Sequence, residues 1–319
     1  MSKAKTNREY TGDSVDLIIP VYRPDEKLDR LIEGINGQTV RPANIFFMQT
    51  LTGDETEDES LTRKLLGVER ATVTTLPRNR YDHGGTRNKG AELSDAPYIL
   101  FMTQDAVPHD DRLIEELLAA VKRDGVSTAY ARQLANDEVG AIERYIREFN
   151  YPDTGIVKSK DDIGRLGIKT YFCSNVCAIY RHDVYDEAGG FVRHTIFNED
   201  SIMAANTINA GYRIAYVAEA SVIHAHKYTY MQQLGRNFDL AVSQRQYREI
   251  FDSVSSESEG IKLVKDTLKH LMKTGRWYLV PDLVLQSGFK YIGYFLGKRY
   301  KILPKALVRK LSMNKSYWD

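Results

Sequence analysis

Short apolar runs alternate with amphipathic segments through about the first hundred residues, and this alternation limits the chain to few folds. Four of the runs are typical of buried strands and cover residues 16–22, 44–48, 71–76 and 98–102. Between the first two, residues 28–35 place apolar side chains at helical spacing on one face. Apolar strands separated by helices are characteristic of a parallel sheet covered on both faces. We therefore predict an α/β fold with a mostly parallel, Rossmann-like sheet flanked by helices.

The pattern becomes less regular after residue 105. The expected elements are helices over residues 113–121, 138–149 and 198–210, strands over 171–180 and 212–219, and loops over 54–59 and 151–168. From about residue 231 the chain is predicted to be mainly helical. These patterns divide it into a polar tail of residues 1–14, an α/β domain of residues 15–240 and a helical region of residues 241–319.

Composition argues against several classes of protein. Lys and Arg total 44 and Asp and Glu 43, so the net charge of +1 gives no general signal for nucleic acid binding. No window holds ~18 uninterrupted apolar residues and the first residues lack an apolar signal core, so neither a membrane-spanning helix nor a leader is predicted. Cys173 and Cys177 are expected to be small core residues, and so low a cysteine count favours a reducing cytoplasm.

The loops beyond the carboxyl ends of the parallel strands are the candidate site, because ligands of such sheets bind there. Thr103, Gln104 and Asp105 follow the strand predicted at residues 98–102. A carboxylate at this position can bind Mg²⁺ or Mn²⁺, which prefer oxygen ligands and often bridge to substrate phosphates. The alternative is that Asp105 caps the helix that follows.

A second cluster, residues 82–88, has the sequence Asp-His-Gly-Gly-Thr-Arg-Asn. Gly84 and Gly85 would allow the backbone to approach a ligand closely, and the start of the helix that follows would favour a phosphate. Arg87 supplies donors suited to a diphosphate. The alternative is an ordinary loop before a helix.

Carboxylate and imidazole side chains form two further candidates. Glu199 and Asp200 begin a predicted helix, where a carboxylate can act as a general base on a sugar hydroxyl or can simply complement the helix dipole. His224 and His226 alternate at the end of a predicted strand, so both side chains point the same way. They are candidate ligands for the same site, or else structural or surface residues.

Taken in order, these motifs resemble the bacterial family-two glycosyltransferases, and in particular their rhamnosyltransferase branch. The resemblance spans roughly residues 16–239, and its most branch-specific part is the string at residues 82–88. The matching segments are residues 18–22, 82–88, 103–106, 174–175, 189–191, 198–200 and 224–226. The resemblance implies a GT-A-like fold, in which residues 15–240 form the catalytic domain.

The resemblance also implies roles position by position. Asp105 would bind the metal, although Thr103 stands where the family's Asp-x-Asp motif has its first acid. Asp200 would be the catalytic base, and one of His224 and His226 would hold the metal or the diphosphate. The other implied residues are, for the nucleotide sugar, Pro20, Val21, Tyr22, Asp54 or Asp82, Gly84, Gly85, Arg87 and Gln104, and, on the acceptor side, Ser174, Asn175 and Glu199.

The implied reaction is an inverting, Mn²⁺- or Mg²⁺-assisted transfer of L-rhamnose from dTDP-β-L-rhamnose. The acceptor would be a lipid-linked precursor of a cell-surface polysaccharide, at the inner face of the cell membrane. Three alternatives stay open. One is an inverting transferase that uses a UDP-sugar, and another is a scaffold protein that binds nucleotide sugars without catalysis. The third is a membrane-bound interaction protein whose basic C-terminal region is the functional part.

The C-terminal region combines basic and aromatic residues. Residues 283–318 contain eight Lys or Arg and no Asp or Glu, with tyrosines, phenylalanines and aliphatic residues between them. This composition is typical of a helix that lies in a membrane interface. The alternative is a helical subdomain that packs on the catalytic core or on another subunit of a homo-oligomer. No nucleic acid partner is predicted.

Overall fold

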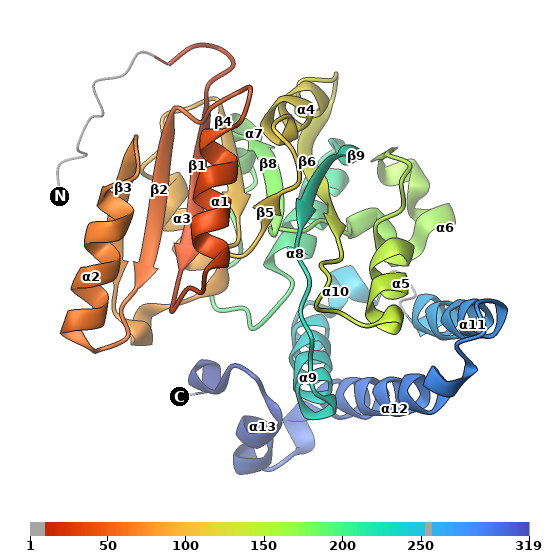
Figure 1. Ribbon diagram of the computed structural model, residues 1–319. Helices are drawn as coiled ribbons and strands as arrows, with labels where there is room; N and C mark the ends of the chain where they lie inside the picture. Colours follow the sequence, from red (N-terminus) through yellow and green to blue (C-terminus); the bar gives the residue numbers. More distant parts are fainter. Residues whose placement is uncertain (1–9, 253–256, 319) are drawn as a thin grey trace.

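The first half of the sheet is parallel, as predicted. The computed structural model describes residues 10–252 and 257–318 (Figure 1). Strands β1 (Val15–Val21), β2 (Asn44–Thr50), β3 (Ala71–Leu76) and β4 (Tyr98–Met102) pair in parallel in the spatial order β3-β2-β1-β4. The side chains of β2 are buried along its whole length, which explains its continuous apolar sequence.

Three helices connect these strands and cover both faces of the sheet: α1 (Lys27–Asn36), α2 (Glu55–Leu66) and α3 (His83–Ala91). In α1, Leu28, Leu31 and Ile35 are buried, as their spacing predicted. The prediction of a loop over residues 54–59 is wrong, because these residues form the beginning of α2. Their acidic side chains complement the positive end of the helix dipole, so a charged run that resembled a loop is a helix start.

Beyond β4 the sheet is mixed. Strand β8 (Cys177–Arg181) is antiparallel to β4 and to β6 (Val126–Leu134), and β6 is parallel to β9 (Arg213–Ile223). The short strands β5 (Val107–Pro108) and β7 (Ile156–Lys158) pair antiparallel with β9. The α/β prediction is thus confirmed, whereas the uninterrupted parallel arrangement is limited to the four N-terminal strands, and β6 and β9 form a separate parallel pair among antiparallel neighbours.

In the part of the chain beyond β4, the helices agree with the sequence-based predictions better than the strands do. They are α4 (Leu113–Val121), α5 (Ala141–Asn150), α6 (Ile163–Leu166), α7 (His182–Glu187) and α8 (Glu199–Asn209). The strand expected over residues 171–180 begins only at Cys177, because a 3₁₀ turn, Gly167–Tyr171, precedes it. The expected loop over residues 151–168 contains β7 and α6 instead.

The C-terminal region is helical, as predicted. It consists of α9 (Tyr230–Gln246), α10 (Arg248–Phe251), α11 (Glu257–Lys273), α12 (Val280–Gly297) and α13 (Lys305–Leu311), and the predicted boundary at residue 240 falls within α9. A Cβ atom at Gly293 or Gly297 would overlap the backbone of α9, so these glycines let α12 pack closely along it. No helix among the described residues is both long and apolar enough to cross a membrane.

Candidate active site

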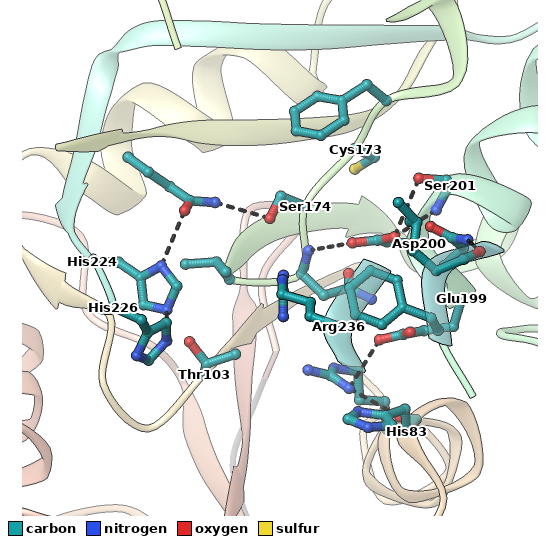
Figure 2. A pocket seen from close by; sticks show the side chains of 18 of the residues that line it. His83, Thr103, Cys173, Ser174, Glu199, Asp200, Ser201, His224, His226 and Arg236 are labelled. Carbon is teal, nitrogen blue, oxygen red and sulfur yellow. Dashed lines mark hydrogen bonds and ion pairs between the residues drawn. The ribbon is translucent and has the colours of Figure 1, made fainter. Parts of the chain in front are cut away.

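A cleft of about 700 Å³ opens at the carboxyl ends of β1 and β4. Most of the residues singled out in the sequence line it. Figure 2 shows His224 and His226 at one end of the cleft and Glu199 and Asp200 at the other. The predicted residues that line the cleft are Pro20, Val21, Tyr22, Arg87, Gln104, Asp105, Ser174, Asn175, Glu199, Asp200, His224 and His226.

The two carboxylates considered for the nucleotide base, Asp54 and Asp82, lie outside this lining and cap helices. Asp54 caps α2 by accepting hydrogen bonds from the amides of Thr56 at 3.0 Å and Glu57 at 3.1 Å. Asp82 caps α3 and also accepts a hydrogen bond from the amide of His194 at 2.9 Å. Both side chains therefore satisfy backbone donors of the protein in this structure.

Gly84 and Gly85 also lie outside the cleft lining, and packing explains why they are glycines. A Cβ atom at Gly84 would overlap the carbonyl oxygen of Val192, and one at Gly85 would lie 2.9 Å from the Oδ1 atom of Asp82. Gly84 thus lets the start of α3 pack against the loop that precedes α8, and Gly85 leaves room for the capping side chain of Asp82. The sequence reasoning identified the need for close backbone approach but assigned it to a ligand.

Gln104 links the two loops at the centre of the site. Its Oε1 atom accepts a hydrogen bond from the amide of Tyr22 at 2.8 Å, and its Nε2 atom donates to the carbonyl of Tyr22 at 3.0 Å. The side-chain amide therefore fixes the backbone beyond β1 next to the backbone beyond β4. Gln104 supports the position of Tyr22 beside the cleft, in addition to lining the cleft itself.

Asp105, His224 and His226 converge at one end of the cleft. The Oδ2 atom of Asp105 lies 3.5 Å from Nε2 of His224 and 3.2 Å from Nε2 of His226, and the two Nε2 atoms are 3.0 Å apart. One ligand atom from each residue falls within 4.8 Å of the others, as a shared cation requires. Two nitrogens bound about 2.1 Å from one ion at a right angle would be about 3 Å apart, which matches the histidine pair.

Gln133, on β6, fixes the orientation of His224. Its Oε1 atom lies 3.0 Å from Nδ1 of His224, and because a carbonyl oxygen only accepts, that ring nitrogen carries the proton. In the neutral ring, Nε2 is then the atom with the free lone pair, and it faces Asp105. The Nε2 atom of Gln133 in turn donates to Tyr151 at 2.6 Å and Ser174 at 2.9 Å, and its oxygen also accepts from Arg147. Such hydrogen bonds behind a ligating histidine are characteristic of metal sites.

The charges of this cluster are those that a cation needs. Burial alone would raise the pKa of Asp105, but the two neighbouring imidazoles hold it well below its usual range. Burial and the neighbouring His224 lower the pKa of His226 to about 4. At neutral pH the cluster therefore contains a carboxylate and a neutral imidazole at His226, which is the protonation state in which these groups bind metals.

Asp200 lies in the first turn of α8, at the opposite end of the cleft. It accepts hydrogen bonds from the amides of Ser201 at 2.7 Å and Asn175 at 3.3 Å. Asn198, just before α8, has a φ of 66°, in the left-handed region, and this sharp turn brings the helix start into the cleft. The carboxylate is thus held on a helix end and not on a loose loop, as a positioned base requires.

Glu199 and Asp200 have opposite electrostatic surroundings. Burial tends to raise the pKa of Glu199, but the Arg87 guanidinium, whose NH1 atom is 3.2 Å from Oε1 of Glu199, lowers it below its usual value. Burial and the negative charge of Glu199 raise the pKa of Asp200 to about 7. Two adjacent carboxylates with pKa values driven apart are a common sign of an acid–base site.

The main partner of Arg87 in this structure is the carboxylate of Glu199, whereas the sequence suggested a diphosphate. Its guanidinium forms the buried ion pair with Glu199 and donates to the carbonyl of His83 at 2.9 Å. Its Nε atom is buried without a hydrogen-bond partner among the described residues. The charge of Arg87 is therefore largely neutralised by Glu199, and its direct effect in this structure is on the pair of carboxylates.

The raised pKa of Asp200 predicts a pH dependence. If Asp200 must be deprotonated to act, kcat/KM should rise with pH up to about 7, roughly tenfold per pH unit on the acidic side. In Glu199→Gln, the neighbouring negative charge is lost while the amide oxygen can still accept from Arg87. The acidic limb should then move to lower pH, because the pKa of Asp200 falls. A pH profile of both proteins over pH 5–9 checks this, and an unmoved limb would contradict the assignment.

The sequence reasoning missed several cleft residues. Arg236, on α9, places its guanidinium 4.8 Å from the ring centre of Phe197 and 5.6 Å from that of Tyr228. Figure 2 shows it at the cleft, with the histidines on one side and Asp200 on the other. One feature of the sequence could have identified Arg236 as a candidate: it is the one charged residue in the first half of α9. Gln133 and Arg147 gave no comparable signal, since only the pairing of distant elements brings them to the site.

The cysteines are buried and unpaired, which confirms the prediction of small core residues. Cys173 also lines the cleft, and burial raises the pKa of its thiol to about 12. A thiol with such a pKa is protonated at neutral pH and is a poor nucleophile. Cys173 therefore contributes shape to the cleft and no covalent chemistry.

Comparison with known proteins identifies the family of the chain. Residues 16–189 match the model of glycosyl transferase family 2, and the chain belongs to this family. It is 35% identical over 309 residues to the O-antigen chain rhamnosyltransferase WbaN of Salmonella anatum and 36% identical over 307 residues to RfbN, of the same description, from Salmonella typhimurium. Each alignment covers 96% of this chain and 96% of the relative. The protein is thus a glycosyltransferase.

Solved structures support the fold. The chain is similar to S. aureus TarS, with a TM-score of 0.56 and 14% identity over 95% of this chain and 85% of the other. It is also similar to the mannosyltransferase PcManGT from Pyrobaculum calidifontis, described in complex with GDP-Man and Mn²⁺, with a TM-score of 0.55 and 12% identity over 95% and 84% of the two chains. The GT-A-like architecture expected from the sequence is confirmed.

Proposed function

We propose that the protein transfers L-rhamnose from dTDP-β-L-rhamnose, with inversion, to a hydroxyl group of a lipid-linked precursor of a cell-surface polysaccharide. The observation that carries this proposal is Asp200, a carboxylate with a pKa near neutrality, placed across one cleft from the Asp105–His224–His226 cluster. The choice of rhamnose and of a polysaccharide acceptor is supported by the two Salmonella relatives, both of which are described as O-antigen chain rhamnosyltransferases.

The reaction needs one displacement. The carboxylate of Asp200 takes the proton of the acceptor hydroxyl as that oxygen forms a bond to the anomeric carbon of the sugar. The bond from the anomeric carbon to the diphosphate oxygen breaks at the same time, through an oxocarbenium-like transition state, and dTDP leaves. Because the attack comes from the face opposite the leaving group, a β-L donor gives an α-L-rhamnoside. No enzyme nucleophile takes part.

A divalent cation fits the cluster, and we propose that Asp105, His224 and His226 hold it. When bound, the ion neutralises negative charge on the departing diphosphate. The donor set of one carboxylate and two imidazoles fits Mn²⁺ better than Mg²⁺, which takes oxygen ligands almost exclusively. Arg236 is the better candidate than Arg87 for a further contact to the diphosphate, because Arg87 is already paired with Glu199.

The remaining cleft residues divide between donor and acceptor. We propose that Pro20, Val21 and Tyr22 contact the nucleotide, since they lie at the end of β1 beside Asp105. Ser174 and Asn175 would lie nearer the acceptor, because the amide of Asn175 contacts Asp200. A lipid-linked acceptor would place the reaction at the cytoplasmic face of the membrane, where two free thiols are stable.

Donor selection tests the proposal. The purified protein is incubated with dTDP-β-L-rhamnose, UDP-glucose, UDP-N-acetylglucosamine and GDP-mannose, each with Mn²⁺, with Mg²⁺ and with EDTA, and nucleotide release is measured. Turnover of dTDP-β-L-rhamnose alone, lost in EDTA, is the expected result. Preferred turnover of a UDP-sugar would keep the mechanism and discard rhamnose. A folded protein that binds none of the four donors would instead support the scaffold alternative.

A further inference from the structure

The outer face of α12 is an exposed apolar stripe. Its members, together called the α12 stripe, recur at helical spacing on the face turned away from α9 and are Val284, Leu285, Tyr291, Ile292 and Phe295. Val284 is 62% and Tyr291 67% exposed, whereas Leu283, Gln286, Gly293 and Gly297 on the opposite face are buried. The stripe contains no charged side chain, so water covers an apolar surface that nothing in the described chain buries.

Aromatic and aliphatic residues extend this surface beyond the helix. Trp277 and Tyr278, which precede α12, are 67% and 63% exposed, and Ile302, which follows it, is 79% exposed. Figure 1 shows α12 at the edge of the molecule, with α9 between it and the sheet. Trp and Tyr are the residues that favour the boundary between water and hydrocarbon.

Cations flank the stripe at both ends. Lys273 and Arg276 precede it, and Arg299, Lys301 and Lys305 follow it; all five are exposed. The guanidinium of Arg299 lies 3.7 Å from the ring centre of Phe295, so charge and apolar surface meet directly. Asp282, the acid nearest to the stripe in the sequence, accepts a hydrogen bond from the hydroxyl of Tyr230 at 2.6 Å.

A second copy of the chain is a poor occupant of this surface. In a two-fold contact between antiparallel α12 helices, the cationic end of one copy would meet the cationic end of the other. Residues 283–318 provide no carboxylate to pair with these charges. An anionic lipid surface, in contrast, offers negative headgroups for the cations and an apolar interior for the stripe.

We propose that the α12 stripe and its flanking cations dock the protein on the surface of a membrane that contains anionic phospholipid, with α12 lying parallel to the surface. The docking surface lies on the outer side of α12, whose inner side packs along α9, the helix that carries Arg236 of the cleft. The segment after α13 is also fixed to α9, through the carboxylate of Asp239, which accepts from the amide of Met313 at 2.9 Å. The inference does not depend on which sugar donor the enzyme uses.

Vesicle flotation of the full chain tests this proposal. Vesicles of phosphatidylcholine alone and of phosphatidylcholine with 30% phosphatidylglycerol (about a third anionic lipid) are compared at 0.1 M and 0.5 M NaCl. The expected result is binding to the anionic vesicles at least about tenfold tighter than to neutral ones, weakened at the higher salt. No binding to the anionic vesicles would overturn the proposal.

Two variants and a matched control locate the surface. Tyr291→Ser, Ile292→Ser and Phe295→Ser combined, and Lys301→Glu with Lys305→Glu, should each weaken vesicle binding about tenfold or more. Leu66→Ser, which removes an equally exposed apolar side chain on α2, should bind like the native protein. Nucleotide release from the donor, measured without lipid, should be unchanged in all of them, which separates this proposal from the proposed function. Native-like vesicle binding by both variants, or a native dimer that the triple variant disrupts, would overturn the proposal.

Discussion

Replacing Asp200 by Asn is expected to lower kcat by about 10²–10⁴-fold while leaving donor affinity largely intact. The amide has the shape of the carboxylate and can still accept the amide hydrogen bonds of Ser201 and Asn175. It cannot take a proton from the acceptor, so the loss should fall on the chemical step. Steady-state kinetics with an acceptor and calorimetric titration of the donor separate the two effects.

Ser201→Ala is the matched control for this experiment. It changes the neighbouring side chain but keeps the amide that holds Asp200, so its turnover should stay within a few-fold of the native rate. If the Asp200→Asn variant has the same melting temperature as the native protein and nearly the same turnover, Asp200 is not the base. The same loss in both variants would indicate that the local structure matters more than the carboxylate.

Replacing Asp105 by Ala is expected to have the second large effect, because it removes the one carboxylate of the cluster with His224 and His226. Affinity for Mn²⁺ should fall at least about tenfold, and turnover at saturating donor should fall with it. Metal binding is measured directly, by the electron paramagnetic resonance signal of free Mn²⁺, so the result does not depend on activity.

Asp110→Ala controls for the loss of one negative charge five residues further along the chain than Asp105. Asp110 is exposed, lies outside the cleft lining and caps the turn to Arg112 with its side chain. The Mn²⁺ affinity and the turnover of the Asp110→Ala variant should match those of the native protein. If Asp105→Ala kept native Mn²⁺ affinity and unchanged metal dependence, the cluster would not be the metal site.

Local pattern was enough for the core of the fold and for the cleft position of several polar side chains at its strand ends. The strands β3 and β4 begin and end where the sequence places them, because buried parallel strands are almost continuously apolar. The position of Asp105 directly after β4, and the alternation of His224 and His226, predicted that they face one site.

Other features depend on tertiary packing and could not be predicted from the local sequence pattern. Gly84 has the same sequence signature whether it approaches a phosphate or the backbone of Val192, and only the folded chain distinguishes these cases. Strand β6 was not predicted, because polar residues on both of its faces obscure the alternation; Gln133, which it carries, orients His224 from 91 residues away. Asp54 lies at the start of a helix whose acidic first turn resembled a loop.

The anomeric configuration of the product tests the central claim most directly. The protein is supplied with dTDP-β-L-rhamnose, Mn²⁺ and an acceptor on which it turns over, and the one-bond carbon–hydrogen coupling at the anomeric carbon is read by NMR. A single displacement assisted by Asp200 predicts an α-L-rhamnoside. A β-L-rhamnoside would require two displacements and an enzyme nucleophile, and would contradict the account of this cleft.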